Sequence, residues 1–198
     1  MHPVLSRTSS VDDLLTGLAA TAARNGRKLR LLDAWEPVTD LAQLPPAVFA
    51  RELAAHLPAV SSPAQAIRSR LVWQCALRAD PGAPQPSDAR FAQVARRILA
   101  ATGIARPDDP HACRWVVIRT DEHEARIIAP LARADGTLAE TTRDRALALA
   151  VCQLDEHTER HSRAGAALTM PTPRSALVAS PPAARTSTVP VAARPLTR

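Results

Sequence analysis

The sequence contains no tyrosine, and its other large apolar anchors are few: three Trp and two Phe in 198 residues. The missing tyrosine excludes a phenolate nucleophile anywhere in the chain. The hydrophobic fraction is 46%, but much of it is alanine, which buries little area per residue. A chain of this length still fits one domain with a core of its own.

Long apolar runs are also absent. There is no stretch of eighteen consecutive apolar residues and no long apolar run near Met1, so neither a transmembrane helix nor a signal peptide is expected. The three cysteines, Cys75, Cys113 and Cys152, have no paired spacing, which favours small buried thiols. No glycine-rich phosphate loop, nucleophile elbow or redox pair occurs. These features predict a cytoplasmic protein without a membrane segment or a cofactor.

The net charge of +6 is unevenly distributed. All 19 acidic residues lie between Asp12 and Glu159, where basic residues balance them, and the excess positive charge follows Glu159. A basic tail adds salt-sensitive, non-specific affinity for DNA. It does not indicate a basic face on the folded domain, and a single Lys among many Arg is also typical of GC-rich coding bias.

Periodicity and capping signals predict helices and strands in alternation along the chain. Helices are expected from Ser10 to Asn25, from Pro46 to Leu57, from Ser87 to Gly103 and from Thr142 to His157. Strands are expected at residues 3–7, 28–35 and 71–78, and in a hairpin formed by residues 113–120 and 127–136. In the last helix, Leu147, Val151 and Leu154 are expected to be buried.

This order of elements predicts an α+β fold in which an antiparallel sheet carries helices packed on one face. The folded domain is expected to span residues 1–160. Residues 161–198 form a basic segment rich in Pro, Ala and Arg, with no acid and no apolar periodicity. A segment of this composition cannot offset its ordering entropy and is expected to be disordered.

Several segments resemble those of one known family in order and spacing. They are the hairpin strands Cys113–Thr120 and Ile127–Gly136, the strand Val72–Ala79, the pair Ser87-Asp88 and the helix end Thr102–Ala105. Together the sequence over about residues 3–157 is similar to actinobacterial relaxase/mobilisation proteins. The resemblance implies a relaxase-like fold. Proteins of that family nick plasmid DNA with a tyrosine and with a metal ion held by three histidines.

The chain departs from the family at the positions that carry this chemistry. Gly17 or a neighbour stands where the family has its tyrosine, and Thr120, Glu124 and Arg126 correspond to the three histidines. Arg126 would put a permanent cation where a divalent metal belongs. The resemblance therefore implies a relaxase-like protein that is catalytically inactive, with neither metal nor cofactor.

Other residues suggest sites of their own. Arginines along the hairpin and the preceding strand are candidates for binding DNA phosphates; they are Arg78, Arg114, Arg119, Arg126 and Arg133. The alternative is a solvated strand face in which Arg126 pairs with Glu124. His157 and His161 share a helix face at a spacing that can hold zinc, although a polar helix end has the same appearance.

The leading functional hypothesis is a DNA-binding or relaxosome accessory protein of a plasmid or integrative element, concerned with conjugation and mobilisation. Its partners would be single-stranded or origin DNA and other mobilisation proteins. A second hypothesis is a protein-interaction module, or a decaying relaxase remnant, without DNA binding. A third is a metal hydrolase that uses His123, His157 or His161.

Overall fold

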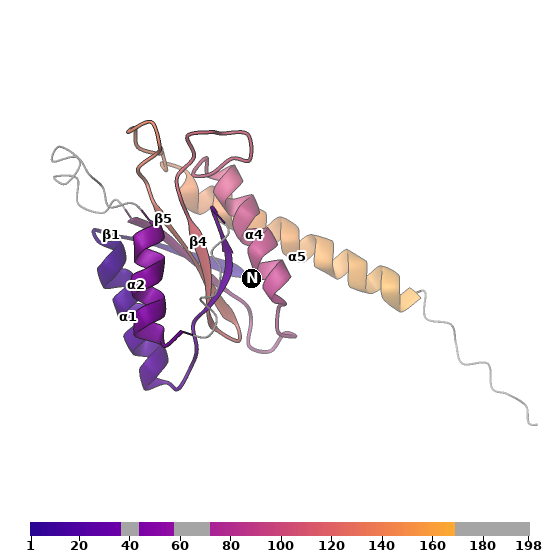
Figure 1. Cartoon of the computed structure of the whole chain (residues 1–198). Coiled ribbons are helices and arrows are strands. Elements are labelled where there is room, and N and C mark those ends of the chain that lie inside the picture. The colour runs from indigo at the N-terminus through magenta and orange to yellow at the C-terminus, as the bar shows by residue number, and fades with distance from the viewer. Residues whose placement is uncertain (37–43, 58–71, 169–198) are drawn as a thin grey trace, which may run out of the picture.

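The computed structural model describes residues 1–36, 44–57 and 72–168, which form a five-stranded sheet and four α-helices (Figure 1). All strand pairs are antiparallel, in the order β1-β3-β5-β4-β2. The strands are β1 (His2–Thr8), β2 (Arg30–Ala34), β3 (Val72–Arg78), β4 (Val116–Asp121) and β5 (Glu124–Pro130). The helices are α1 (Val11–Arg24), α2 (Pro46–His56), α4 (Asp88–Ala101) and α5 (Asp144–Leu168). The α+β class and the antiparallel sheet are confirmed.

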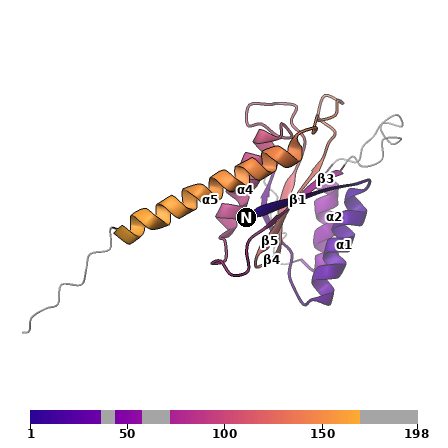
Figure 2. The ribbon, with the colours of Figure 1, turned by 180° about the vertical axis from the view of Figure 1, so that it is seen from behind.

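Helices cover both faces of the sheet, so the expectation that they pack on one face is wrong (Figures 1 and 2). The core beneath α4 and α5 includes Val117 and Ile127, whereas the core beneath α1 and α2 includes Ile118 and Ile128. Successive residues of a strand point to opposite faces. Because β4 and β5 are apolar without interruption at these positions, both faces need a cover.

Local signals fix the helix ends as the sequence predicts. The Ser10 hydroxyl accepts a hydrogen bond from the Asp13 amide at 3.1 Å, and the Ser87 hydroxyl accepts one from the Arg90 amide at 3.2 Å. Both satisfy amide groups that the first turn of a helix leaves without partners. Gly103 follows α4 with φ +74°, a conformation that favours glycine, and it lets the chain leave the helix at that point.

The last helix, α5, differs from its prediction in both length and orientation. It continues to Leu168 and projects beyond the sheet, so residues 161–168 are helical rather than part of a disordered tail (Figure 2). The good helix formers of this segment, rich in alanine, account for the extension. The later tail residues, 169–198, lie outside the described residues.

The buried face of α5 carries small and polar side chains. Ala148, Cys152 and Asp155 are buried, whereas Leu147 is 36% exposed and Leu154 is 67% exposed. Burial was predicted for the two leucines, which is wrong. Small side chains let the helix approach the sheet closely, and Asp155 is stabilised by an ion pair with Arg90 at 2.7 Å. Among the described residues, no helix has the length and apolar character needed to cross a membrane.

Candidate functional site

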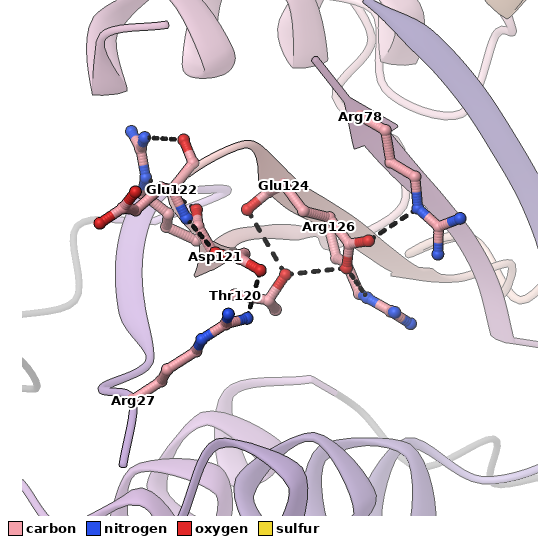
Figure 3. Close-up of polar contacts among 8 residues, drawn as sticks. Arg27, Arg78, Thr120, Asp121, Glu122, Glu124 and Arg126 are labelled. Atoms are coloured by element: carbon pink, nitrogen blue, oxygen red, sulfur yellow. Dashed lines mark hydrogen bonds and ion pairs between the residues drawn. The ribbon is translucent and has the colours of Figure 1, made fainter. Parts of the chain in front are cut away.

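A polar cluster lies on the face of the sheet that α1 and α2 partly cover, where β3 ends and β5 begins (Figure 3). We call Arg78, Thr120, Glu124 and Arg126 the Glu124 cluster. The Nε atom of Arg78 donates to Oε2 of Glu124 at 2.8 Å, and the Nε atom of Arg126 donates to Oε1 at 2.8 Å. The Thr120 hydroxyl donates to the same Oε1 at 2.9 Å. One carboxylate thus holds two guanidinium groups.

Strand register explains why these residues meet. Arg78 lies directly opposite Glu124 across the β3–β5 pair, and Arg126 follows Glu124 by two residues, so all three share one face. Thr120 lies at an irregularity between the β4–β5 pairs of Arg119 and Asp121. An extra residue of this kind re-aims a side chain. At this position the Thr120 hydroxyl reaches the Glu124 carboxylate.

The cluster is positive overall, with two guanidinium groups around one carboxylate. Burial alone would raise the pKa of Glu124, but hydrogen bonds from Arg126 and Arg78 outweigh it and hold that pKa below its ordinary value. Within the described part of the chain, the terminal nitrogens of Arg78 and Arg126 have no hydrogen-bond partner. Arg78 is 47% exposed and Arg126 is 24% exposed at the side chain. The arrangement can therefore bind an anion through positioned guanidinium groups.

Sequence reasoning missed a polar pair further along the same face. Gln74 on β3 lies opposite Ser6 on β1, and its Nε2 atom donates to the Ser6 hydroxyl at 2.6 Å. Its Oε1 atom is buried and has no partner among the described residues. A buried acceptor without a partner is uncommon and marks a site to explain. The available signal was alternation in β3, which assigns Gln74 and Arg78 to one strand face.

Arg119 lies on the opposite face and serves the fold. It is 7% exposed, and its guanidinium lies over the Phe91 ring at 5.0 Å. It donates to the carbonyl oxygens of Pro86, Asp121 and Glu122, and it forms an ion pair with Asp88 at 2.5 Å. Arg119 thus ties the start of α4 to the β4–β5 turn and is not accessible to DNA.

Arg114 and Arg133 lie at the far end of the same hairpin. Arg114 precedes β4, and Arg133 follows β5, where it forms an ion pair with Asp109 at 2.7 Å. The five candidate arginines therefore do not form one surface. The structure brings together Arg78 and Arg126, separates Arg114 and Arg133 from them, and buries Arg119.

The remaining candidate positions do not join the Glu124 cluster into a catalytic arrangement. Gly17 is exposed on α1, and a Cβ atom built there would meet none of the described atoms within 4 Å. His123 lies in the turn between β4 and β5, as predicted, and its carbonyl oxygen accepts from the Ala79 amide at 2.8 Å. His157 and His161 stack on exposed α5 with ring centroids 4.1 Å apart. Across the described ranges, no group of three or more His, Cys, Asp or Glu is arranged to hold a metal ion.

The three cysteines are buried free thiols, as predicted. Burial raises the pKa of Cys113 and of Cys152 to about 11, and it raises the pKa of Cys75 further. A protonated thiol is a poor nucleophile. At neutral pH these side chains therefore act as small core residues.

Comparisons with protein-family models, with curated proteins and with solved structures gave no significant match. The Glu124 cluster offers two positioned guanidinium groups and one hydroxyl group but, among the described residues, neither an activated nucleophile nor a set of metal ligands. Its chemistry is that of binding an anion.

Proposed function

We propose that this protein is a catalytically inactive, relaxase-related protein that binds DNA as an accessory of mobilisation. The observation that carries the proposal is the pair of guanidinium groups held by Glu124. Each is anchored through Nε, which leaves its two terminal nitrogens without a hydrogen-bond partner among the described residues. Two preoriented guanidinium groups fit successive phosphates of a nucleic-acid backbone.

A neighbouring amide supports the same ligand. Gln74 lies on the same sheet face, and its Nε2 atom, which donates one hydrogen to Ser6, has a second hydrogen to donate, as side-chain amides do to phosphate oxygens in DNA complexes. Single-stranded DNA is the preferred form, because a strand can follow a sheet face with its bases turned outward or stacked. The basic residues after Glu159 add non-specific attraction.

The test is fluorescence anisotropy with labelled single-stranded and duplex oligonucleotides and the full chain. The variant Arg78→Gln/Arg126→Gln is compared with Arg143→Gln/Arg145→Gln, which removes the same charge beside the start of α5. A net charge-assisted hydrogen bond contributes about 1.5–3 kcal/mol, so affinity is expected to fall at least about tenfold per guanidinium. Equal affinities for the two double variants would overturn the proposed site.

A second function is favoured by a different observation. Leu147 and Leu154 on α5 are exposed, and their spacing of seven residues places them on one face of the helix. An exposed apolar helix face is typical of a surface that contacts another protein. A protein-interaction module without DNA binding would not change the anisotropy of either oligonucleotide, whether unmodified or as either double variant, and it would lose its protein partner when Leu154 is replaced by Gln.

A further inference from the structure

A groove lies at the start of β4, at the opposite end of that strand from the Glu124 cluster. It has a volume of about 730 Å³ and is walled by the end of β2, the last turns of α4 and the loop that leads to β4. Its apolar lining includes Trp35, Leu99, Pro107, Pro110 and Trp115. We call it the Trp35 groove.

Two of the three tryptophans of the chain meet in this groove. The Trp35 amide donates to the Trp115 carbonyl oxygen at 2.9 Å, which fixes the two residues beside each other. Trp35 is 37% exposed, whereas Trp115 is 8% exposed and Leu99 is 1% exposed. A large ring that is left open above a buried floor offers apolar area for a ligand.

Charged residues of both signs line the groove. Arg96 is already paired with Asp33, through bonds of 2.5 and 2.9 Å. Asp109 is paired with Arg133, so that, among the described residues that line this groove, Asp108 and Arg106 are the charged groups without an ion-pair partner. Asp108 therefore offers an unpaired carboxylate to a ligand that is apolar in part and carries a cation.

The same chain contains a segment of that chemistry. Residues 169–198 include six prolines and four arginines and no acidic residue. Within them, the pattern Pro-x-Ala-Ala-Arg occurs twice, at residues 181–185 and 190–194. Prolines dock into grooves lined by aromatic rings, because the polyproline II conformation is preformed and loses little entropy on binding. The arginine follows the proline by about 12 Å in that conformation.

The length of the chain permits this docking. α5 has 25 residues and is therefore about 37 Å long. The first turn of α5 lies close to the groove, because Arg106 and Asp109 line both the groove and a neighbouring cavity that Asp144 also lines. To reach the groove, the segment that follows Leu168 must therefore run back over about the length of α5. Pro181 lies 13 residues after Leu168, which spans about 40 Å in polyproline II conformation, and Pro190 has a longer reach.

We propose that the Trp35 groove binds a Pro-x-Ala-Ala-Arg repeat from the C-terminal segment of its own chain. A proline of the repeat packs against the Trp35 and Trp115 rings. The arginine of the repeat then pairs with Asp108. The proposal is independent of DNA binding, because it involves neither Arg78 nor Arg126.

The test uses paramagnetic relaxation in the full chain. A nitroxide is attached through Ser187→Cys, which lies between the two repeats, and the three native thiols are buried and do not compete for the label. The indole N–H signals of ¹⁵N-labelled protein are followed, with Trp35→Phe and Trp115→Phe for assignment. Loss of the Trp35 and Trp115 signals on labelling, reversed when the nitroxide is reduced, is the expected result.

A matched variant controls for chance encounters. It carries the same nitroxide, but serine replaces the repeat residues Pro181, Pro182, Arg185, Pro190 and Arg194, and its Trp73 signal reports that the domain is folded. Both indole signals should persist in this variant. The proposal is overturned if the Trp35 and Trp115 indole signals persist in the labelled protein with unmodified repeats, or if they disappear equally in the variant.

Two further outcomes identify other occupants. In a mixture of ¹⁵N-labelled chain without nitroxide and unlabelled chain with nitroxide, signal loss would assign the groove to a second copy and would overturn docking within one chain. An oligonucleotide that shifts the Trp35 indole while the nitroxide has no effect would assign the groove to nucleic acid, with the same consequence.

Discussion

Replacement of Arg119 by Met should destabilise the domain by about 3 kcal/mol. Arg119 is 7% exposed and donates to three carbonyl oxygens, those of Pro86, Asp121 and Glu122. Methionine retains much of the packing on the Phe91 ring but leaves these acceptors without a donor. The bond to Pro86 is buried and the other two are partly buried, and the loss of each bond from the charged guanidinium costs about 1 kcal/mol. Asp88 contributes little to the loss, because Arg30 still pairs with it at 2.6 Å.

The assay is equilibrium unfolding in urea together with a thermal melt. For a domain of this size, about 3 kcal/mol corresponds to a fall in Tm of about 6–12 °C. Arg126→Met is the matched control: its guanidinium is partly exposed, and Glu124 keeps Arg78 and Thr120 as partners, so a loss below about 1 kcal/mol is expected. If Arg119→Met unfolds at the same urea concentration as the unmodified protein, the structural role assigned to Arg119 is wrong.

Three other predictions concern the cluster, the thiols and α5. Glu124→Gln should lower the free energy of unfolding at neutral pH. The difference from the unmodified protein should shrink as the pH falls toward the lowered pKa of Glu124, because the carboxylate stabilises the folded state only while it is ionised. A difference that stays constant from pH 7 to acid pH, in urea titrations, argues against the ion pairs. The thiols should react with Ellman's reagent only after unfolding, because all three are buried, and fast reaction of the native chain would contradict their burial. Leu154→Gln should change the free energy of unfolding by less than about 0.5 kcal/mol. Leu99→Ala, the buried control, should lower it by about 2–5 kcal/mol. Similar losses of stability in the two variants would mean that α5 buries the face that carries Leu154.

Most of the fold could be predicted from features that involve residues close together in the sequence. The two serine caps and Gly103 mark helix ends through contacts within a few residues, so the sequence is enough to find them. The alternation of Trp73, Cys75 and Leu77 likewise identifies β3. The number of sheet faces that helices cover depends on tertiary packing between distant parts of the chain, so local features do not predict it. Only the unbroken apolar runs of β4 and β5 could have indicated two layers.

The candidate site was predictable in part, for a related reason. Alternation assigns Arg119 and Arg126 to opposite faces, and the pairing of Arg126 with Glu124 was among the alternatives that the sequence offered. Burial of Arg119 was not predictable, because its acceptors come from the loop before α4 and from the β4–β5 turn. The irregularity at Thr120 depends on strand register, which a single sequence does not specify.

The salt dependence of DNA binding tests the central claim most directly. The observed association constant for a single-stranded oligonucleotide is measured over a range of salt concentrations for the unmodified full chain and for Arg78→Gln/Arg126→Gln. Each phosphate contact on a single strand contributes about 0.7 to the slope of log K against log salt, so the double variant should have a slope smaller by about 1.4. An unchanged slope, with unchanged affinity, would contradict a phosphate-binding role for the guanidinium pair that Glu124 holds.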